Sequence, residues 1–170
     1  NEAFSVIPGI TVKFKVAGHI LGSAIVEMCL EENGKQTKLI FTGDIGQPNQ
    51  PIIEDPANLT CSDFVITEST YGDRTHEVYD KEGELARIVN EAAESGGNVV
   101  IPAFAVGRTQ VLLYYFQKLL SEGKIPEIPI YVDSPMANKA THITMNNPAE
   151  YDEEAEALYV MHGRRLVDMK

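Results

Sequence analysis

The first part of the chain alternates hydrophobic and polar positions with a period of two. In residues 10–16 the apolar and polar side chains alternate at every step, which is the pattern of a strand with one buried face. Residues 24–30 and 37–41 predict two further strands, and the Asn33-Gly34 pair between them is typical of a tight hairpin turn. We therefore expect an antiparallel meander over residues 10–42.

The pattern changes after a polar stretch with three prolines, residues 47–58. Short continuous apolar runs now alternate with helical periods, which is typical of parallel strands covered on both faces. The predicted strands cover residues 64–67, 99–101 and 128–132, and the predicted helices cover residues 80–94, 107–121, 133–145 and 149–161. The order predicts two βαβ units, so the expected fold class is α/β, with an antiparallel piece followed by a parallel sheet.

The amino-acid composition excludes some classes of function. The 170 residues carry 14 Lys and Arg against 25 Asp and Glu, a net charge of −11, which argues against a passive electrostatic binder of nucleic acid. It does not exclude a nucleic-acid enzyme that gathers positive charge locally. No apolar run is long enough for a transmembrane helix, so we expect no membrane partner. Cys29 and Cys61 predict buried, reduced thiols and a cytoplasmic location, with one disulfide left open.

The ends of the chain suggest an excerpt. The sequence begins at Asn1 without Met, and its last residues read as the start of a new segment. We therefore expect it to be part of a longer protein.

Two turns in the antiparallel piece carry candidate metal ligands. His19 lies between Gly18 and Gly22 just after a strand, and Asp44 follows another strand between Gly43 and Gly46. An imidazole suits a metal ligand or a catalytic base, and a carboxylate can bridge two metal ions. The alternatives are a histidine that bonds to backbone and an Asx-turn made by Asp44.

Polar residues also follow the predicted strands of the second piece. Residues 68–74 begin with Glu68, Ser69 and Thr70, and Arg108 and Ser134 stand at the starts of two helices. Ligands of open α/β sheets bind beyond the carboxyl ends of the strands, and helix N-termini attract phosphate. The alternatives are a solvated loop, an ordinary turn, and an ion pair of Arg108 with Glu68 or Asp133.

Taken together, these segments resemble the metallo-β-lactamase fold nucleases that carry a β-CASP domain. The nearest branch contains the nuclease subunit of the cleavage and polyadenylation specificity factor and its bacterial and archaeal RNA-processing homologues. Five segments occur in the family's order: Gly18–Ser23, Thr42–Asp44, Glu68–Arg74, Pro102–Gln110 and Val132–Ala137. In this resemblance, residues 1–58 end the first metallo-β-lactamase segment of an αββα fold, and residues 59–170 form an incomplete β-CASP domain.

The resemblance implies roles for these residues. His19 is similar to a ligand of one zinc, Asp44 to the catalytic carboxylate that bridges two zincs, and Glu68 to an acid that orients a catalytic histidine. The implied reaction is hydrolysis of single-stranded RNA by zinc-activated water. Ser69, Thr70, Arg108 and Ser134 are the expected phosphate contacts.

The sequence departs from the family where most zinc ligands should be. The His-x-His-x-Asp-His motif and the later motif histidines are absent. Since even one catalytic zinc site generally takes three protein ligands, we expect the isolated chain to be inactive and the longer protein to be the hydrolase.

Three questions stay open at this point. A non-catalytic scaffold subunit of an RNA-processing complex is the main alternative function, although such members lose zinc ligands. The sequence does not separate an endonuclease from an exonuclease, and it leaves open whether the protein forms a homodimer.

Overall fold

The computed structural model describes residues 2–75 and 79–161. The chain divides into two compact units, residues 1–75 and 76–170. The expected boundary at residue 58 separates family segments and stays a prediction.

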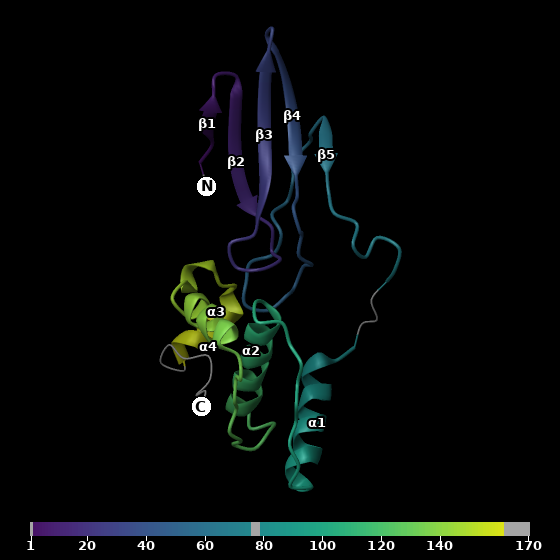
Figure 1. The fold of residues 1–170 in the computed structure, drawn as a ribbon, viewed down its shortest axis with the longest axis vertical. Coiled ribbons are helices and arrows are strands. Elements are labelled where there is room, and N and C mark those ends of the chain that lie inside the picture. Colours follow the sequence, from purple (N-terminus) through teal and green to yellow (C-terminus); the bar gives the residue numbers. More distant parts are fainter. Residues whose placement is uncertain (1, 76–78, 162–170) are drawn as a thin grey trace. The chain divides into compact units, whose positions relative to one another are not determined.

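The first unit is built on one five-stranded sheet whose strands lie side by side in sequence order (Figure 1). The first four strands pair antiparallel, and the last pairs parallel with its neighbour. The strands are β1 (Phe4–Ile7), β2 (Ile10–Val16), β3 (Ala24–Glu32), β4 (Lys35–Phe41) and β5 (Phe64–Ile66). The predicted meander is confirmed, and β1 is an additional edge strand that the sequence pattern did not predict.

The hairpin between β3 and β4 turns at Asn33 and Gly34, as predicted. Their φ angles are 53° and 74°. Two successive left-handed residues match the right-handed twist of the flanking strands, and Asn-Gly adopts them at low cost. The turn fixes the register, in which Glu32 faces Lys35.

The predicted parallel sheet of residues 64, 99 and 129 is wrong. Residues 64–66 do form a strand, but it joins β4 of the antiparallel sheet. Hydrogen bonds of Asp63 fasten it there: its N–H donates to the Lys38 carbonyl over 2.9 Å, and its carboxylate accepts from the Lys38 N–H over 2.7 Å.

The other two apolar runs do not become strands in the described part of the second unit. A strand requires a row of partners for its N–H and C=O groups, and within residues 79–161 these runs contain only an isolated β-bridge residue, Ile130. Residues 128–132 are apolar for a different reason: Ile128, Ile130 and Val132 pack against a helical core. Val100 is 88% exposed.

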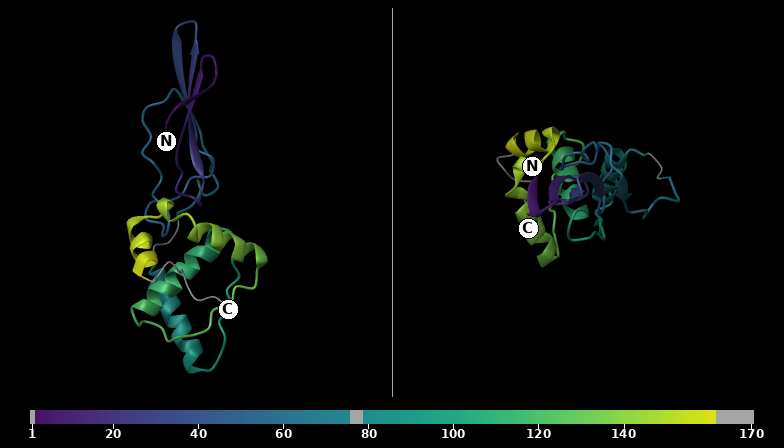
Figure 2. Two further views of the ribbon diagram at one scale, coloured as in Figure 1. Left: turned by 90° about the vertical axis from the view of Figure 1, so that its left-hand side faces the viewer. Right: turned by 90° about the horizontal axis from the view of Figure 1, so that it is seen from above.

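The described part of the second unit contains four α-helices close to the predicted ranges, with α1 and α2 side by side (Figure 2). Asp80 caps the first by accepting from the Gly83 N–H over 2.9 Å. The last predicted helix is divided at Tyr151. The helices are α1 (Lys81–Glu94), α2 (Arg108–Ser121), α3 (Pro135–Met145), the 3₁₀ turn η1 (Pro148–Glu150) and α4 (Glu153–Met161). No helix in residues 79–161 is long and apolar enough to cross a membrane.

One apolar cluster holds α1, α2 and the segment after α2 together. Its members are buried, as expected from the apolar faces of the two helices. They are Val89, Leu113, Phe116, Leu119 and Ile125.

The two cysteines are free, as expected, but they are not buried. Cys29 lies half-buried on β3, and Cys61 is exposed in the loop before β5. For Cys29 the apolar neighbours in the sequence were misleading, because alternate positions of a strand face opposite sides of the sheet.

Candidate functional site

His19 stands on a tight turn after β2 that is held by Ser23. The Ser23 hydroxyl accepts from the backbone N–H groups of His19 and Ile20, each over 3.2 Å. These hydrogen bonds involve only the backbone of His19, so its imidazole ring takes no part in them. The ring is 43% exposed.

The loop of Asp44 lies directly on this turn. The Gly46 N–H donates to the Ala17 carbonyl over 2.8 Å, and the position of a Cβ on Gly46 is only 1.6 Å from the Gly18 carbonyl oxygen. Gly18 is in turn packed against Pro56 and has a φ of 65°. Glycine is therefore required at both places by close backbone approach.

The His19 turn and the Asp44 loop both pack on a small apolar core. Ala17, Ile25 and Ile40 are fully buried, and Ile45 packs against them. Ile45 is the neighbour of Asp44, so the same cluster that anchors the His19 turn also anchors the Asp44 loop.

This packing brings the two candidate ligands together. His19 Nε2 lies 4.0 Å from Asp44 Oδ2, and the Asp44 side chain is 76% exposed. Two donors bound to one zinc at about 2.0–2.2 Å can be separated by at most about 4.4 Å, so this pair fits one ion. In residues 2–75 the Asp44 carboxylate accepts no backbone hydrogen bond, so the alternative Asx-turn is not formed.

Glu68 connects the end of β5 to the Asp44 loop. Its Oε1 accepts from the Ile45 N–H over 2.9 Å. The Thr70 hydroxyl and the Ile45 N–H hold the pKa of Glu68 below its usual range, with a smaller contribution from nearby His19. Glu68 therefore remains a carboxylate at neutral pH and fixes the residue next to Asp44.

The pair does not make a complete metal site by itself. No group of three His, Cys, Asp or Glu residues with the arrangement of a metal site occurs among the described residues. Since catalytic zinc generally takes three protein ligands, His19 and Asp44 fit as part of a ligand set.

The predicted phosphate contacts differ in what their side chains already do. In the first unit, Ser69 is exposed, whereas the Thr70 hydroxyl donates to Glu68. In the second unit, the Ser134 hydroxyl caps α3 by accepting from the Ala137 N–H over 3.1 Å. Ser69 thus remains the available hydroxyl of the three.

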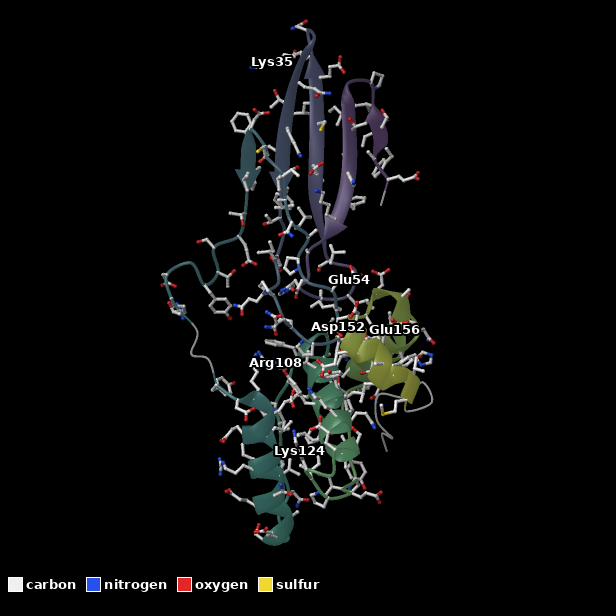
Figure 3. The ribbon with its side chains drawn as sticks, turned by 180° about the vertical axis from the view of Figure 1, so that it is seen from behind. Lys35, Glu54, Arg108, Lys124, Asp152 and Glu156 are labelled. Carbon is white, nitrogen blue, oxygen red and sulfur yellow. The ribbon has the colours of Figure 1, made fainter. Side chains whose placement is uncertain are left out.

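Arg108 begins α2, and its side chain is exposed (Figure 3). Within the described part of the second unit it forms no ion pair with Asp133, so that structural alternative is not observed. The expected free N–H donors at this helix start are mostly occupied: Arg108 N–H donates to Val106 over 3.2 Å, and Thr109 N–H to Phe104 over 3.3 Å. Its guanidinium, more than the helix terminus, is the candidate phosphate donor.

Gln110 has a structural role that the sequence did not reveal. Its Oε1 accepts from the Gly107 N–H over 2.7 Å, and its Nε2 donates to Ala105 over 3.1 Å and to the Thr141 hydroxyl over 2.8 Å. It thereby closes the turn before α2 and attaches α3. The only local signal was the position of Gln110 three residues after a glycine, as in a capping box.

Several known proteins are similar in sequence to this chain. A Beta-Casp domain model matches residues 109–168. Ribonuclease TTHA0252 from Thermus thermophilus is 35% identical over 89% of this chain and 34% of its own length. Transcription termination factor FttA from Methanosarcina mazei is 33% identical over 96% of this chain and 26% of its own length. Cleavage and polyadenylation specificity factor 73 from Drosophila melanogaster is 36% identical over 73% of this chain and 18% of its own length.

The chain belongs to the β-CASP family. The resemblance inferred from the five sequence segments is therefore confirmed. The chain spans about a third or less of the length of these β-CASP relatives, and the roles of His19, Asp44, Glu68, Ser69, Thr70, Arg108 and Ser134 stay predictions.

Proposed function

We propose that this chain is part of a zinc-dependent RNA nuclease that hydrolyses phosphodiester bonds. The observation that carries the proposal is the 4.0 Å approach of His19 Nε2 to Asp44 Oδ2 on two interlocked loops. The names of the relatives, a ribonuclease and a cleavage factor subunit, support RNA as the substrate. The antiparallel sheet supports the assignment of residues 1–58 to a metallo-β-lactamase segment.

His19 and Asp44 would contribute ligands to a zinc pair, and the remaining ligands would come from outside these residues. Bound zinc would supply a water of lowered pKa and stabilise negative charge on phosphoryl oxygens. Glu68, which holds the Ile45 N–H, keeps the neighbouring Asp44 oriented. Ser69 and Arg108 would contact the substrate phosphates.

The incomplete ligand set also leads us to propose that the isolated chain does not cleave RNA. The main competing proposal is a non-catalytic scaffold subunit. Such a subunit does not need converging zinc donors, so the His19–Asp44 pair favours the nuclease.

The proposal is tested on the full-length protein with His19→Ala and Asp44→Ala. Each change should lower the zinc content measured by elemental analysis and abolish cleavage of a single-stranded RNA. His142→Ala is a matched control, because His142 is exposed on α3, and it should leave both unchanged. Unchanged zinc in the His19 and Asp44 variants would refute the ligand assignment. A wild-type protein that binds RNA without cleaving it would favour the scaffold.

A further inference from the structure

Tyr71 and Arg74 form an exposed aromatic–cation pair in the loop after β5. The Arg74 Cζ lies 5.9 Å from the centre of the Tyr71 ring. Tyr71 is 56% exposed, and the Arg74 side chain is 61% exposed. Burial of apolar surface therefore does not account for the placement of this large aromatic ring.

Local hydrogen bonds hold the pair in place. The Gly72 N–H donates to the Ser69 carbonyl over 3.1 Å, and the Arg74 N–H donates to the Tyr71 carbonyl over 3.3 Å. Asp73 Oδ1 accepts from Arg74 Nε over 3.0 Å. That bond engages Nε alone, so the two terminal guanidinium nitrogens remain as donors outside it.

Glu68 links the pair to the loop of the candidate metal ligand Asp44. Glu68, which accepts from Ile45 beside Asp44, precedes Tyr71 by three residues, so their Cα atoms are at most about 11 Å apart. A substrate strand with a phosphate at Asp44 would therefore have its neighbouring nucleotides within reach of this loop.

Charge supports a contact with phosphate at this place. Arg74 is the one arginine in the sequence of residues 1–75. The half-buried Lys15 and Lys38 both pair with Glu27 on the sheet, at 3.2 and 3.1 Å. Arg74 is also paired, with Asp73 at 3.0 Å, but its side chain is far more exposed than those of the two lysines. In a chain of net charge −11, it is therefore one of few local attractions for RNA.

We propose that Tyr71 and Arg74 form a nucleotide subsite, in which one base of single-stranded RNA stacks on the pair and Arg74 contacts the adjoining phosphate. The inference rests on the proposed function, because it assumes RNA at the Asp44 loop. Stacking accepts any base, since every base has a π face, so the subsite would position the strand without reading its sequence. The competing explanation is that the pair only stabilises its own loop.

The test measures binding of a single-stranded RNA of about twelve nucleotides to the full-length protein. All variants are made in an Asp44→Asn background, and a gel confirms that the RNA stays intact. Tyr71→Ala should weaken binding about 5- to 150-fold, which is 1–3 kcal/mol at 1.4 kcal/mol per tenfold. Tyr71→Phe should bind like the background protein, because it keeps the ring. Arg74→Ala should reduce the slope of log K against log salt by about 0.7.

A scan with a single abasic position identifies the stacked base. In the background protein one or two abasic positions should weaken binding, and in Tyr71→Ala these same positions should no longer matter. Tyr79→Ala is the matched control, since Tyr79 is 63% exposed on the other unit. If Tyr71→Ala unfolds, Tyr71→Leu, which keeps apolar bulk without a π face, takes its place.

The outcomes separate the two proposals. Tight binding by the Tyr71 variants, or an abasic profile that Tyr71→Ala does not change, would overturn the subsite while the nuclease proposal stands. A wild-type protein that neither binds nor cleaves this RNA would overturn the nuclease proposal as well.

Discussion

Gly46 lies directly against Gly18, with the site of a Gly46 Cβ only 1.6 Å from the Gly18 carbonyl oxygen. This contact joins the two loops that carry His19 and Asp44, and it leaves no room for a side chain between them. The separation of the two candidate ligands therefore depends on backbone packing as well as on the ligands themselves.

Replacing Gly46 by alanine should separate the loops. The new methyl group would clash with backbone, which has no flexible end to move, and overpacking of this kind costs about 1–3 kcal/mol. We expect Gly46→Ala to lower the melting temperature and the zinc content of the full-length protein together. Gly97→Ala is the control, because a Cβ there meets nothing closer than 3.4 Å. A Gly46→Ala variant with normal zinc content would show that the contact does not set the ligand spacing.

Replacing Glu68 should act through Ile45. Glu68→Gln keeps an oxygen that accepts from the Ile45 N–H, whereas Glu68→Ala removes it. Because groups that orient metal ligands typically contribute 10- to 100-fold, Glu68→Ala should lower the rate of RNA cleavage by about that factor and Glu68→Gln by less. Glu94→Ala, at the exposed end of α1, controls for the loss of one negative charge. Equal defects in the Gln and Ala variants would mean that the charge of Glu68 matters more than its hydrogen bond.

The sequence predicted the local elements better than their assembly. The Asn33-Gly34 turn was predicted from short-range rules of backbone geometry and is present. The caps at Asp80 and Ser134 obey rules of the same kind. The partner of β5 could not be predicted in this way, because a short apolar run is compatible with either neighbour. Hydrogen bonds between Lys38 and Asp63, 25 residues apart, decide the pairing.

At the candidate site, too, local turns were predictable from the sequence and long-range contacts were not. Glycines beside His19 and Asp44 drew attention to both turns, but their contact at Gly18 and Gly46 is a long-range feature that no local pattern encodes. At α2, the sequence suggested free N–H groups for an anion. In the structure, the N–H groups of this turn donate instead to the Gln110 side chain and to nearby backbone carbonyls.

Gln110 should be a strong determinant of stability in the second unit. It is 4% exposed, and its amide is the partner of the fully buried Thr141 hydroxyl. Gln110→Ala would leave that hydroxyl without a partner, so we expect a loss of about 1–3 kcal/mol in the free energy of unfolding. Thr141→Val in the same background should restore part of the loss, because it removes the orphaned group. Denaturant unfolding of the wild type, Gln110→Ala, Thr141→Val and the double variant gives the coupling energy between the two residues, and additive losses would exclude it.

Acid should weaken the sheet through Glu27. Burial raises the pKa of Glu27, but Lys38 and Lys15 on the neighbouring strands lower it by more, so the net shift is downward. A carboxyl with a lowered pKa in the folded state contributes stability that is complete above the unfolded value of about 4.5 and is lost as the pH falls further. Glu27→Gln should therefore unfold more easily at pH 7 and show a flatter decline in melting temperature between about pH 5 and pH 2. Parallel curves for the two proteins would contradict this.

Arg108 should bind RNA without holding the fold. Its side chain is exposed at the start of α2, and within the described second unit no carboxylate neutralises it, so removing it should not change the melting temperature. If it contacts one phosphate of single-stranded RNA, Arg108→Ala should reduce the slope of log K against log salt by about 0.7. Arg108→Lys should keep most of that slope, because the charge remains.

Arg87→Ala is the matched control for this measurement. Arg87 is an exposed arginine on α1 that already pairs with Glu84 at 2.6 Å and Glu91 at 2.7 Å. Its charge is neutralised locally, so its loss should leave the salt slope unchanged and cost at most about 1 kcal/mol of stability. A lower melting temperature of Arg108→Ala with an unchanged salt slope would show the opposite assignment, in which Arg108 stabilises the turn before α2 and another cation contacts the RNA.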